Sequence, residues 1–530
     1  MRTLVLFILA VLWASCLQAQ PTFMRVYKST GTAQGNLNEL TSGNLRVGMA
    51  RQSGSSLMDP GGNILQSHNY RVDTFLVLQS VEKYTDNEFY FVGGYYKDTC
   101  SSVDFGVIPN IYPVIGRMDS LGNVLAINYY AFNGGCQKPA GDLTVTSNKS
   151  VVTWGRDASF FAMQADSMGE PVWAKSFSSH GGVQFIKELP GGDLLAGINM
   201  DTAGAVVARL DAAGNFIWIK SYIRPRGMVH DCVILSDDAF VITGFTDSTA
   251  STNPFEPLPL DYHPKLFMLK LDGSGDVQWC RGYDGGSNLW YARRGSRVVR
   301  AQDGNFVVLA NLGAVGYNLY YRPLLMKADL NGDTLWTRSY GLFNYQYETQ
   351  RLLAYSDGGF LFNGRIHGAI PDGSTSAAYL YKTDVLGHLP CQESYHQLLV
   401  SDLFPTDSSF TLASVDGALA MPAFVSDTVY DPITAYNGCT FVTGLSPISA
   451  GKFRVYPNPN TGHFTVAFAD PLMAESYYSI YDAMGKLLYQ RPLPQGKTTE
   501  EVDLSRYGPG TYVIRCTDRD GVWVERVVVE

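Results

Sequence analysis

The sequence predicts an all-β protein, a seven-bladed β-propeller followed by a small C-terminal β-sandwich. Three observations lead to this fold class. A short turn pattern recurs along residues 59–387, alternating apolar segments flank its copies, and residues 454–530 carry a separate set of short strands and turns. The composition agrees, because 45% apolar residues and 53 Gly suit a large, turn-dense β core.

The turn pattern is an Asp with a Gly three positions later and, in its clearest copies, a Trp seven positions later. Alternating apolar segments such as residues 205–210 and 216–222 flank it, which is typical of half-buried strands. The Asp side chain can cap backbone N–H groups while Gly takes a positive φ, so we expect a hairpin turn; a calcium loop is the alternative. The copies begin at Asp59, Asp119, Asp166, Asp211, Asp272, Asp329 and Asp384.

A second tight turn lies between successive copies. It occupies residues 41–44, 190–193, 302–305 and 356–359, and Asp-Gly between apolar strands is a strong hairpin signal. Two hairpins per unit make four strands, and a spacing of roughly 45 to 60 residues is within the range of propeller repeats. Seven such units predict seven blades. Residues 391–440 fit less well, and an incomplete eighth blade or an appended hairpin are the alternatives there.

The recurring Trp173, Trp218, Trp279 and Trp336 are interpreted as packing between blades, because an aromatic residue at a fixed register is usually core. The pattern around them also resembles the tryptophan-docking motif of quinoprotein propellers, which implies an oxidoreductase with a quinone cofactor. No adjacent Cys pair of the kind common in those enzymes is present. Residues 23–29 look like a displaced outer strand, which we expect to close the ring by pairing in the last blade.

The two ends of the chain indicate an exported protein. Residues 1–19 have the features of a secretory signal peptide, with lipid attachment at Cys16 as the alternative. No other segment is long and apolar enough to span a membrane. A net charge of −9 and a pI near 5.4 argue against nucleic acid as a main partner. The predicted organisation is a signal peptide at 1–19, a propeller at 20–440, a linker at 441–453 and a sandwich at 454–530.

Seven cysteines remain after Cys16, and an exported protein can form disulfides. Cys232 and Cys280 lie in strand patterns and are interpreted as buried free thiols. Spacing alone does not fix the pairing, so other partners stay open. The pairs that we favour, because they lie in irregular sequence, are Cys100 with Cys136 and Cys391 with Cys439.

The sequence carries no motif for catalysis, metal binding or cofactor binding. It contains no nucleophile elbow, no zinc-protease helix, no phosphate-cradling glycine loop and no Cys-x-x-Cys pair, and its His residues are scattered. We therefore predict no catalytic residue, no cofactor and no metal site.

The face opposite the tight turns is the candidate ligand face. Both tight turns of a unit open on one end of the ring, so the longer connections gather at the other end. Aromatic residues mixed with Arg in residues 285–294, 313–322 and 343–347 can stack on sugars or hold peptides. The alternative is that they only cover the rim. The candidate residues are Trp290, Tyr291, Arg293, Arg294, Tyr320, Tyr321 and Arg322.

Residues 454–530 resemble a known family. The motif residues are Tyr456, Pro457, Asn458, Pro459, Gly462, Gly485, Gly510 and Tyr512. They resemble the C-terminal sorting domain of type IX secretion substrates in Bacteroidetes, and the resemblance covers nearly all of the segment. It implies export through the type IX secretion machinery, usually followed by removal of the domain and anchoring to surface lipopolysaccharide. The chain ends in Glu530, where the family usually ends in Lys or Arg.

We therefore expect a cell-surface or secreted propeller that acts as a binding or adhesion module for a glycan or peptide. The alternative is an enzyme on the same ring, such as a polysaccharide lyase, a hydrolase or a quinoprotein. A structural scaffold in surface assemblies is a third alternative. Carboxylates, His and Arg clustered at the mouth of the channel would favour an enzyme, and an aromatic, uncharged rim would favour binding.

Overall fold

The chain divides into two compact units, Met1–Cys439 and Thr440–Glu530, in the computed structural model. The residues that the structure describes are 22–27, 36–49, 54–71, 75–102, 106–132, 137, 139–155, 160–177, 181–200, 203–222, 227–246, 265–285, 289–291, 296–314, 321–341, 345–368, 376–395, 398–423, 426–430, 435–437, 453–468, 476–482, 487–518 and 521–530. Within these ranges, nothing helical has the length and apolarity needed to cross a membrane.

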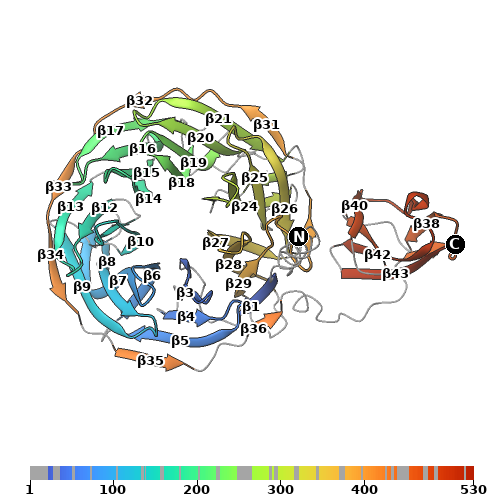
Figure 1. Ribbon diagram of the computed structural model, residues 1–530, viewed down its shortest axis with the longest axis horizontal. Coiled ribbons are helices and arrows are strands. Elements are labelled where there is room, and N and C mark those ends of the chain that lie inside the picture. The colour runs from blue at the N-terminus through green and yellow to red at the C-terminus, as the bar shows by residue number, and fades with distance from the viewer. Residues whose placement is uncertain are drawn as a thin grey trace, which may run out of the picture. The chain divides into compact units, whose positions relative to one another are not determined.

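The described part of the first unit forms seven antiparallel sheets arranged as the blades of a propeller (Figure 1). Blades 1 to 3 consist of β2 (Leu37–Glu39), β3 (Leu45–Met49), β4 (Gly54–Met58) and β5 (Ile64–Arg71); β6 (Phe75–Lys83), β7 (Glu88–Ser102), β8 (Gly106–Asp119) and β9 (Val124–Phe132); and β10 (Ala140–Val145), β11 (Val151–Gly155), β12 (Phe160–Ala165) and β13 (Pro171–Phe177). Blades 4 to 6 consist of β14 (Gly181–Glu188), β15 (Leu194–Met200), β16 (Gly204–Leu210) and β17 (Phe216–Ser221); β18 (Met228–Ser236), β19 (Ala239–Thr246), β20 (Lys265–Asp272) and β21 (Val277–Asp284); and β22 (Leu289–Tyr291), β23 (Arg297–Arg300), β24 (Phe306–Ala314), β25 (Tyr321–Ala328) and β26 (Thr334–Tyr340). The prediction of seven blades is confirmed.

Blade 7 closes the ring with a strand from the other end of the chain. It consists of β27 (Gln346–Ala354), β28 (Phe360–His367), β29 (Ser376–Lys382) and β1 (Phe23–Tyr27). β1 is antiparallel to β29, with Phe23 opposite Lys382 and Tyr27 opposite Ala378. The predicted closing strand is therefore confirmed, and it removes the free edge that blade 7 would otherwise expose.

A belt of short strands runs around the outside of the ring and adds one outer strand to every blade (orange in Figure 1). The belt, residues 393–437, consists of β30 (Glu393–Ser394), β31 (Leu399–Asp402), β32 (Ser408–Ser409), β33 (Ser414–Asp416), β34 (Ala418–Pro422), β35 (Ser426–Tyr430) and β36 (Ala435–Asn437). These strands pair in turn with β26, β21, β17, β13, β9, β5 and β1. The belt thus visits the blades in the reverse of their chain order.

Both alternatives predicted for residues 391–440 are wrong, because the belt is neither an eighth blade nor an appended hairpin. Its strands are too short to bury a face against one another, and a strand pair alone is marginal in water. Each one instead pairs with the outer strand of an existing blade. This pairing satisfies the N–H and C=O groups along the outer edge of each sheet, which would otherwise recruit other strands.

The repeated Asp turns have the predicted capping geometry. In blade 4, Asp211 Oδ1 accepts hydrogen bonds from the backbone N–H groups of Ala213 at 2.9 Å and Asn215 at 2.8 Å. The hydrogen bonds donated by the backbone and side chain of Asn215 lower the pKa of Asp211. The same carboxylate cap recurs at Asp59, Asp119, Asp166, Asp272, Asp329 and Asp384.

The fourth residue of the turn must be Gly for two reasons. Gly275 has a φ of +78°, where a side chain would be strained. A Cβ atom there would also lie 2.9 Å from Tyr222 Oη and 3.0 Å from the Trp218 ring of the preceding blade. Trp173, Trp279 and Trp336 meet the next turn glycine in the same way. The interpretation of the Trp residues as packing between blades is therefore confirmed.

A tyrosine four residues after the Trp position joins each blade to the next. In blade 4, Tyr222 is buried, and its hydroxyl donates a hydrogen bond to the Gly275 carbonyl of blade 5 at 2.6 Å. At the blade 3 to blade 4 junction the equivalent residue is Phe177, and Trp173 packs on Gly214 there. The pairs joined by this hydrogen bond are Tyr27–Gly62, Tyr70–Gly122, Tyr130–Gly169, Tyr222–Gly275, Tyr283–Gly332 and Tyr340–Gly387, at 2.6 to 2.8 Å.

Ion pairs hold the belt to the ring. The belt contains six acidic residues and no Lys or Arg, whereas several outer strands carry a basic residue two positions after the Trp position. Lys175 lies 3.0 Å from Asp416, and Lys220 lies 3.2 Å from Asp407. Arg281–Asp402 and Arg338–Glu393 continue the series. Each exposed pair contributes only about 0–1 kcal/mol, but together they favour one register of the belt.

The second unit is a small sandwich of two sheets, as predicted. One sheet consists of β37 (Phe453–Tyr456), β38 (His463–Phe468) and β41 (Thr499–Asp503), and the other of β40 (Leu487–Leu493), β39 (Ser476–Asp482), β42 (Gly510–Asp518) and β43 (Gly521–Val529). A single 3₁₀ turn, η2 (Ser505–Tyr507), precedes β42. Phe464, Ile480 and Ile514 belong to the core that both sheets share.

We predict that Tyr222→Phe lowers the free energy of unfolding by about 1 kcal/mol, because it removes one buried hydrogen bond between blades and leaves the packing unchanged. Urea unfolding followed by tryptophan fluorescence would measure the change. Tyr395→Phe is the matched control, since Tyr395 is 67% exposed. Equal stability of both variants would show that the Tyr–Gly hydrogen bond does not couple the blades.

Candidate functional site

The ligand-face candidates lie in blade 6 at the end opposite the tight turns. Register places Trp290 of β22 opposite Gly313 of β24, and Gly313 opposite Tyr321 of β25. Tyr291 and Arg322 occupy the adjacent row. These four candidates are therefore strand residues rather than the loop residues that we expected, because the connection before β23 forms an extra short strand on the end of β24.

Their burial differs. Tyr321 is half-buried, and Arg322 is 3% exposed. Tyr347, from another segment assigned to this face, is fully buried, so it is not exposed to a ligand. Arg293, Arg294, Tyr320 and the side chains of Trp290 and Tyr291 lie outside the described residues.

A cluster of charged side chains, which the sequence analysis missed, lies on the innermost strands. We call it the axial cluster. Six blades contribute one member each, three of them acidic and three basic. The members are Glu82 on β6, Asp142 on β10, Lys187 on β14, Asp231 on β18, Arg297 on β23 and Arg351 on β27.

β-Bulges set the positions of several cluster residues. The pairing register shifts just before Asp142, Asp231 and Arg351, and likewise before Ser80 on β6. A bulge inserts one residue and re-aims the side chains that follow it. In the innermost strands the regular alternation of apolar and polar side chains is therefore interrupted at the bulges. Polar residues follow the bulges where the rest of the core has apolar ones.

Asp142 joins three blades. Its Oδ1 accepts hydrogen bonds from Ser80 Oγ at 2.7 Å and from the backbone N–H of Leu143 at 3.0 Å. Its Oδ2 lies 2.7 Å from a guanidinium nitrogen of Arg351. Blades 3 and 7 are not neighbours, so this ion pair spans the central space of the ring.

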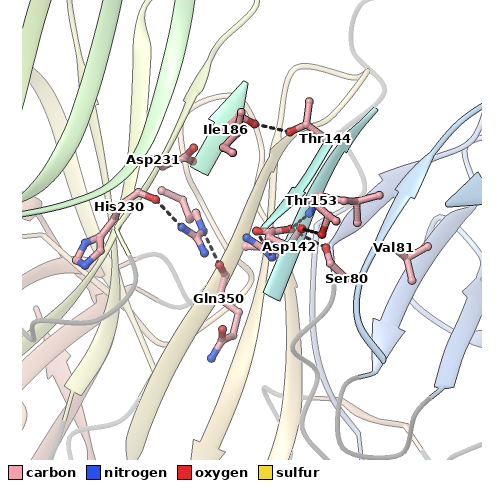
Figure 2. Close-up of polar contacts among 12 residues, drawn as sticks. Ser80, Val81, Asp142, Thr144, Thr153, Ile186, His230, Asp231 and Gln350 are labelled. Carbon is pink, nitrogen blue, oxygen red and sulfur yellow. Dashed lines mark hydrogen bonds and ion pairs between the residues drawn. The ribbon is translucent and has the colours of Figure 1, made fainter. Parts of the chain in front are cut away.

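Asp231 and Arg297 join blades 4 to 7. Figure 2 labels three of the residues involved, His230, Asp231 and Gln350. Lys187 Nζ lies 2.7 Å from Asp231 Oδ1, and the backbone N–H of Val298 donates to Oδ2 at 3.2 Å. Arg297 donates to the carbonyls of Gln350 at 2.8 Å and His230 at 3.0 Å. Burial alone would raise the pKa of Asp231, but the positive charges of Lys187 and Arg297 hold it below its usual value.

The pKa of Glu82, a member of the cluster, is strongly raised. Burial, reinforced by the negative charge of Asp142, raises the pKa of Glu82 to about 8. The positive charges of Lys187 and Arg351 offset only part of this effect. Near neutral pH Glu82 is therefore a carboxylic acid that can donate a proton, while Asp142 and Asp231 are paired carboxylates.

The disulfide predictions are tested in part. Cys100 and Cys391 are each disulfide-bonded, whereas Cys232 and Cys280 are free and buried. The predicted partners, Cys136 and Cys439, lie outside the described residues, so both pairings stay predictions. Burial raises the pKa of the Cys232 and Cys280 thiols to about 12, which makes them unreactive.

The opening turn of the second unit holds its final strand. Asn458 Oδ1 accepts a hydrogen bond from the Val528 N–H at 2.8 Å, and Asn458 Nδ2 donates to the Arg526 carbonyl at 2.6 Å. The N–H of Glu530 donates to the Asn460 carbonyl at 2.8 Å. Tyr456, Pro457 and Pro459 around this contact are exposed. The motif thus ties the first strand to the C-terminus and presents a surface.

Three other motif residues shape the same unit. At Gly462, with a φ of +102°, a Cβ atom would lie 2.8 Å from the Cα atom of Ser505. The Tyr512 hydroxyl, from the strand that Gly510 begins, donates to the Gly508 carbonyl at 2.7 Å. Gly485 lies outside the described residues.

Comparison with protein families assigns this unit. Residues 454–530 match the family model described as "Secretion system C-terminal sorting domain". The second unit is a sorting domain. The sorting domain directs the protein to type IX export, and the protein is therefore surface-attached or secreted.

Solved structures similar to this chain are distant. A protein of unknown function from Bacteroides caccae is 9% identical, with 60% of this chain and 93% of that chain covered and a TM-score of 0.32. A catalytically inactive virginiamycin B lyase from Staphylococcus aureus, solved with quinupristin, is 10% identical, with coverage of 69% and 97% and a TM-score of 0.41. No curated protein matches the chain.

We predict that Glu82→Gln stabilises the protein increasingly as pH rises from about 4.5 to about 8. A raised carboxyl pKa contributes stability below the unfolded value, and that stability is lost as pH rises through the folded value. Glutamine cannot ionise, so the variant avoids this loss and should gain about 1–3 kcal/mol near pH 9. Unfolding free energies across this pH range would measure it.

Glu170→Gln is the control, because Glu170 is exposed on a turn. It measures what replacing an exposed glutamate does to the free energy of unfolding across the same pH range. A flat profile for Glu82→Gln would mean that Glu82 ionises normally in the folded protein.

Proposed function

We propose that this protein is an exported binding module that presents the face opposite the tight turns to a glycan or peptide. The observation that carries the proposal is the division of the connections. Short turns join the strands at one end of the blades, whereas at the other end β19 stops at Thr246 and the next strand, β20, starts only at Lys265. Binding residues concentrate on such connections when a rigid scaffold supports them.

An aromatic row in blade 6 supports a specific place on that face. Trp290 and Tyr321 are aligned across three strands with Gly313 between them. Positions two strands apart are about 9–10 Å apart, and glycine leaves the middle position without a side chain. Such a gap suits a flat sugar ring or a planar side chain between two aromatic residues.

The sorting domain supports the same proposal. Export by the type IX machinery brings the ring to the cell surface or the medium, where glycans and peptides are available ligands. The belt and the closing strand leave the described blades without free outer edges, which suits a domain that works outside the cell.

We predict that Trp290→Ala and Tyr321→Ala each weaken ligand binding by about tenfold or more, since a lost aromatic stacking contact costs on the order of 1.4 kcal/mol. Screening the natural protein on glycan and peptide arrays would identify the ligand, and titration of the variants would give the affinities. Their melting temperatures should change little.

Tyr395→Ala is the matched control, because Tyr395 is an exposed tyrosine on the belt, away from blade 6's inner strands. It should bind like the natural protein. Unchanged binding by both blade 6 variants would reject this face as the ligand site.

A second candidate function is acid catalysis at the axial cluster, as expected for a hydrolase or lyase. The specific observation is Glu82, whose pKa of about 8 keeps a proton available near neutral pH beside Lys187 and Arg351. Assays of the natural protein and Glu82→Gln on a polysaccharide panel separate the two functions. Turnover that disappears in the variant would favour the enzyme, and absence of turnover in the natural protein would favour binding alone.

A further inference from the structure

The second and third strands of blade 2 project beyond the rest of that blade. β7 has 15 residues and β8 has 14, whereas the other described strands of the ring have at most nine. β9 pairs with β8 only from Val114 onwards, so residues 106–113 of β8 pair with β7 alone among the described strands. At about 3.4 Å per residue, this hairpin extends roughly 25 Å beyond the last pair with β9, at the end opposite the tight turns.

Three tyrosines gather where the hairpin leaves the blade. Tyr95 of β7 lies opposite Tyr112 of β8, and Tyr129 comes from β9. The ring centroids of Tyr112 and Tyr129 are 5.5 Å apart with the rings at 77°, and those of Tyr95 and Tyr129 are 5.2 Å apart. Tyr95 and Tyr112 are half-buried, and Tyr129 is 9% exposed. This tyrosine cluster is therefore partly open to solvent.

A lysine of the same hairpin lies over the tyrosine cluster. The pairing register shifts between Tyr96 and Asp98, so Lys97 is the residue that a β-bulge inserts, and the bulge aims its side chain. The ammonium group lies 4.9 Å from the ring centroid of Tyr129 and 5.8 Å from that of Tyr112. Lys97 Nζ also donates a hydrogen bond to the Tyr129 hydroxyl at 2.9 Å, which raises the pKa of Lys97. The cluster thus holds a charged ammonium group against two aromatic rings.

A carboxylate completes the surroundings of that ammonium group. Asp98 accepts hydrogen bonds from Asn110 Nδ2 at 2.7 Å and from the Tyr112 hydroxyl at 3.2 Å. Asn110 is 9% exposed, and its Oδ1 accepts a hydrogen bond from the backbone N–H of Gln137 at 2.6 Å. A buried amide therefore fixes the position of an exposed carboxylate, whose negative charge also acts on Lys97.

The ring faces, the hydroxyl acceptor and the carboxylate are the groups that bind an ammonium ion. In the protein alone they bind the side chain of Lys97, which is exposed. An exposed contact between a cation and an aromatic ring favours the bound arrangement by only about two- to fivefold. An ammonium group from another molecule can therefore take the place of Lys97.

We propose that the tyrosine cluster is a binding site for a lysine side chain of a partner polypeptide, and that Lys97 occupies the site until the partner displaces it. A lysine is favoured over an amino sugar because a lysine side chain is what the cluster already accommodates. The net charge of −9 also favours a basic partner. The site lies on blade 2, so it does not depend on the ligand site proposed in blade 6.

Saturation-transfer NMR titrations of the full-length protein test the ligand class. The probe is the peptide acetyl-Gly-Lys-Gly-amide, and its matched control is the same peptide with the lysine Nε-acetylated. We expect the acetylated peptide to bind at least about fivefold more weakly, because acetylation removes the positive charge. Equal affinities would overturn the proposal. Tighter binding of a glucosamine trimer than of the lysine peptide would overturn it too, since the ligand would then be an amino sugar.

Variants of the hairpin test the role of Lys97. Lys97→Ala empties the site and should bind the lysine peptide about two- to fivefold more tightly, a gain that misfolding cannot produce. Asp98→Asn keeps the shape of an exposed side chain and should bind about two- to fivefold more weakly. Lys149→Ala is the matched control, because Lys149 also lies over a tyrosine, 5.5 Å from the Tyr84 ring centroid, but in a tight turn. Its affinity should be unchanged.

Two results with these variants would reject the site. If Lys97→Ala binds the peptide no more tightly than the natural protein, Lys97 does not occupy the place of the ligand. If Asp98→Asn keeps the natural affinity while the protein still prefers the unmodified lysine peptide, the lysine is bound elsewhere on the protein.

Discussion

A hydrogen bond from a tyrosine hydroxyl to the turn carbonyl of the next blade is the interaction on which the ring depends. It recurs at six of the seven junctions; at the seventh, Phe177 takes the place of the tyrosine and Trp173 packs on the turn glycine, as tryptophans also do at three other junctions. The bond requires a turn that brings its backbone to the surface of the neighbouring sheet, which explains why the Asp cap and the Gly with positive φ recur together. The same repeated turn thus ends one hairpin and packs its blade against the preceding one.

The remaining polar contacts hold the blades together at the axis of the propeller and at its outer edge. At the axis, Lys187 pairs with Asp231 of the next blade, and Asp142 with Arg351 joins blades that are not neighbours. At the outer edge, acidic belt residues pair with basic residues of the outer strands. Breaking one partner of a buried pair is more costly than losing an exposed pair, so the axial contacts restrict the blade angles more strongly than the belt contacts do.

The local parts of the fold could be predicted from sequence because each has its own chemistry. The Asp-x-x-Gly turns, the alternating strands and the displaced first strand all carry short-range signals. The tyrosine and the basic residue that follow the Trp position also repeat, so a comparison of the repeats over a longer window would have found both. The sorting domain could be recognised because its motif residues close its own first and last strands.

Two parts could not be predicted in the same way. The belt strands are two to five residues long, and their apolar residues, such as Leu399 and Leu419, are largely exposed, so no alternation marks them. The axial cluster combines residues that are far apart in sequence, such as Asp142 and Arg351. Which of them meet is decided by the number of blades and by the bulges, and neither determines a contact until the ring is closed.

The pairing of β1 with both β29 and β36 has a consequence for how the protein matures. Blade 7 needs the earliest and the latest strands of the propeller at once, so it cannot be completed until nearly the whole propeller segment has been synthesised. Such distant contacts form slowly. The last strand of the ring, β36, is therefore synthesised shortly before the sorting domain. A chain whose ring is complete is close to carrying its sorting domain as well.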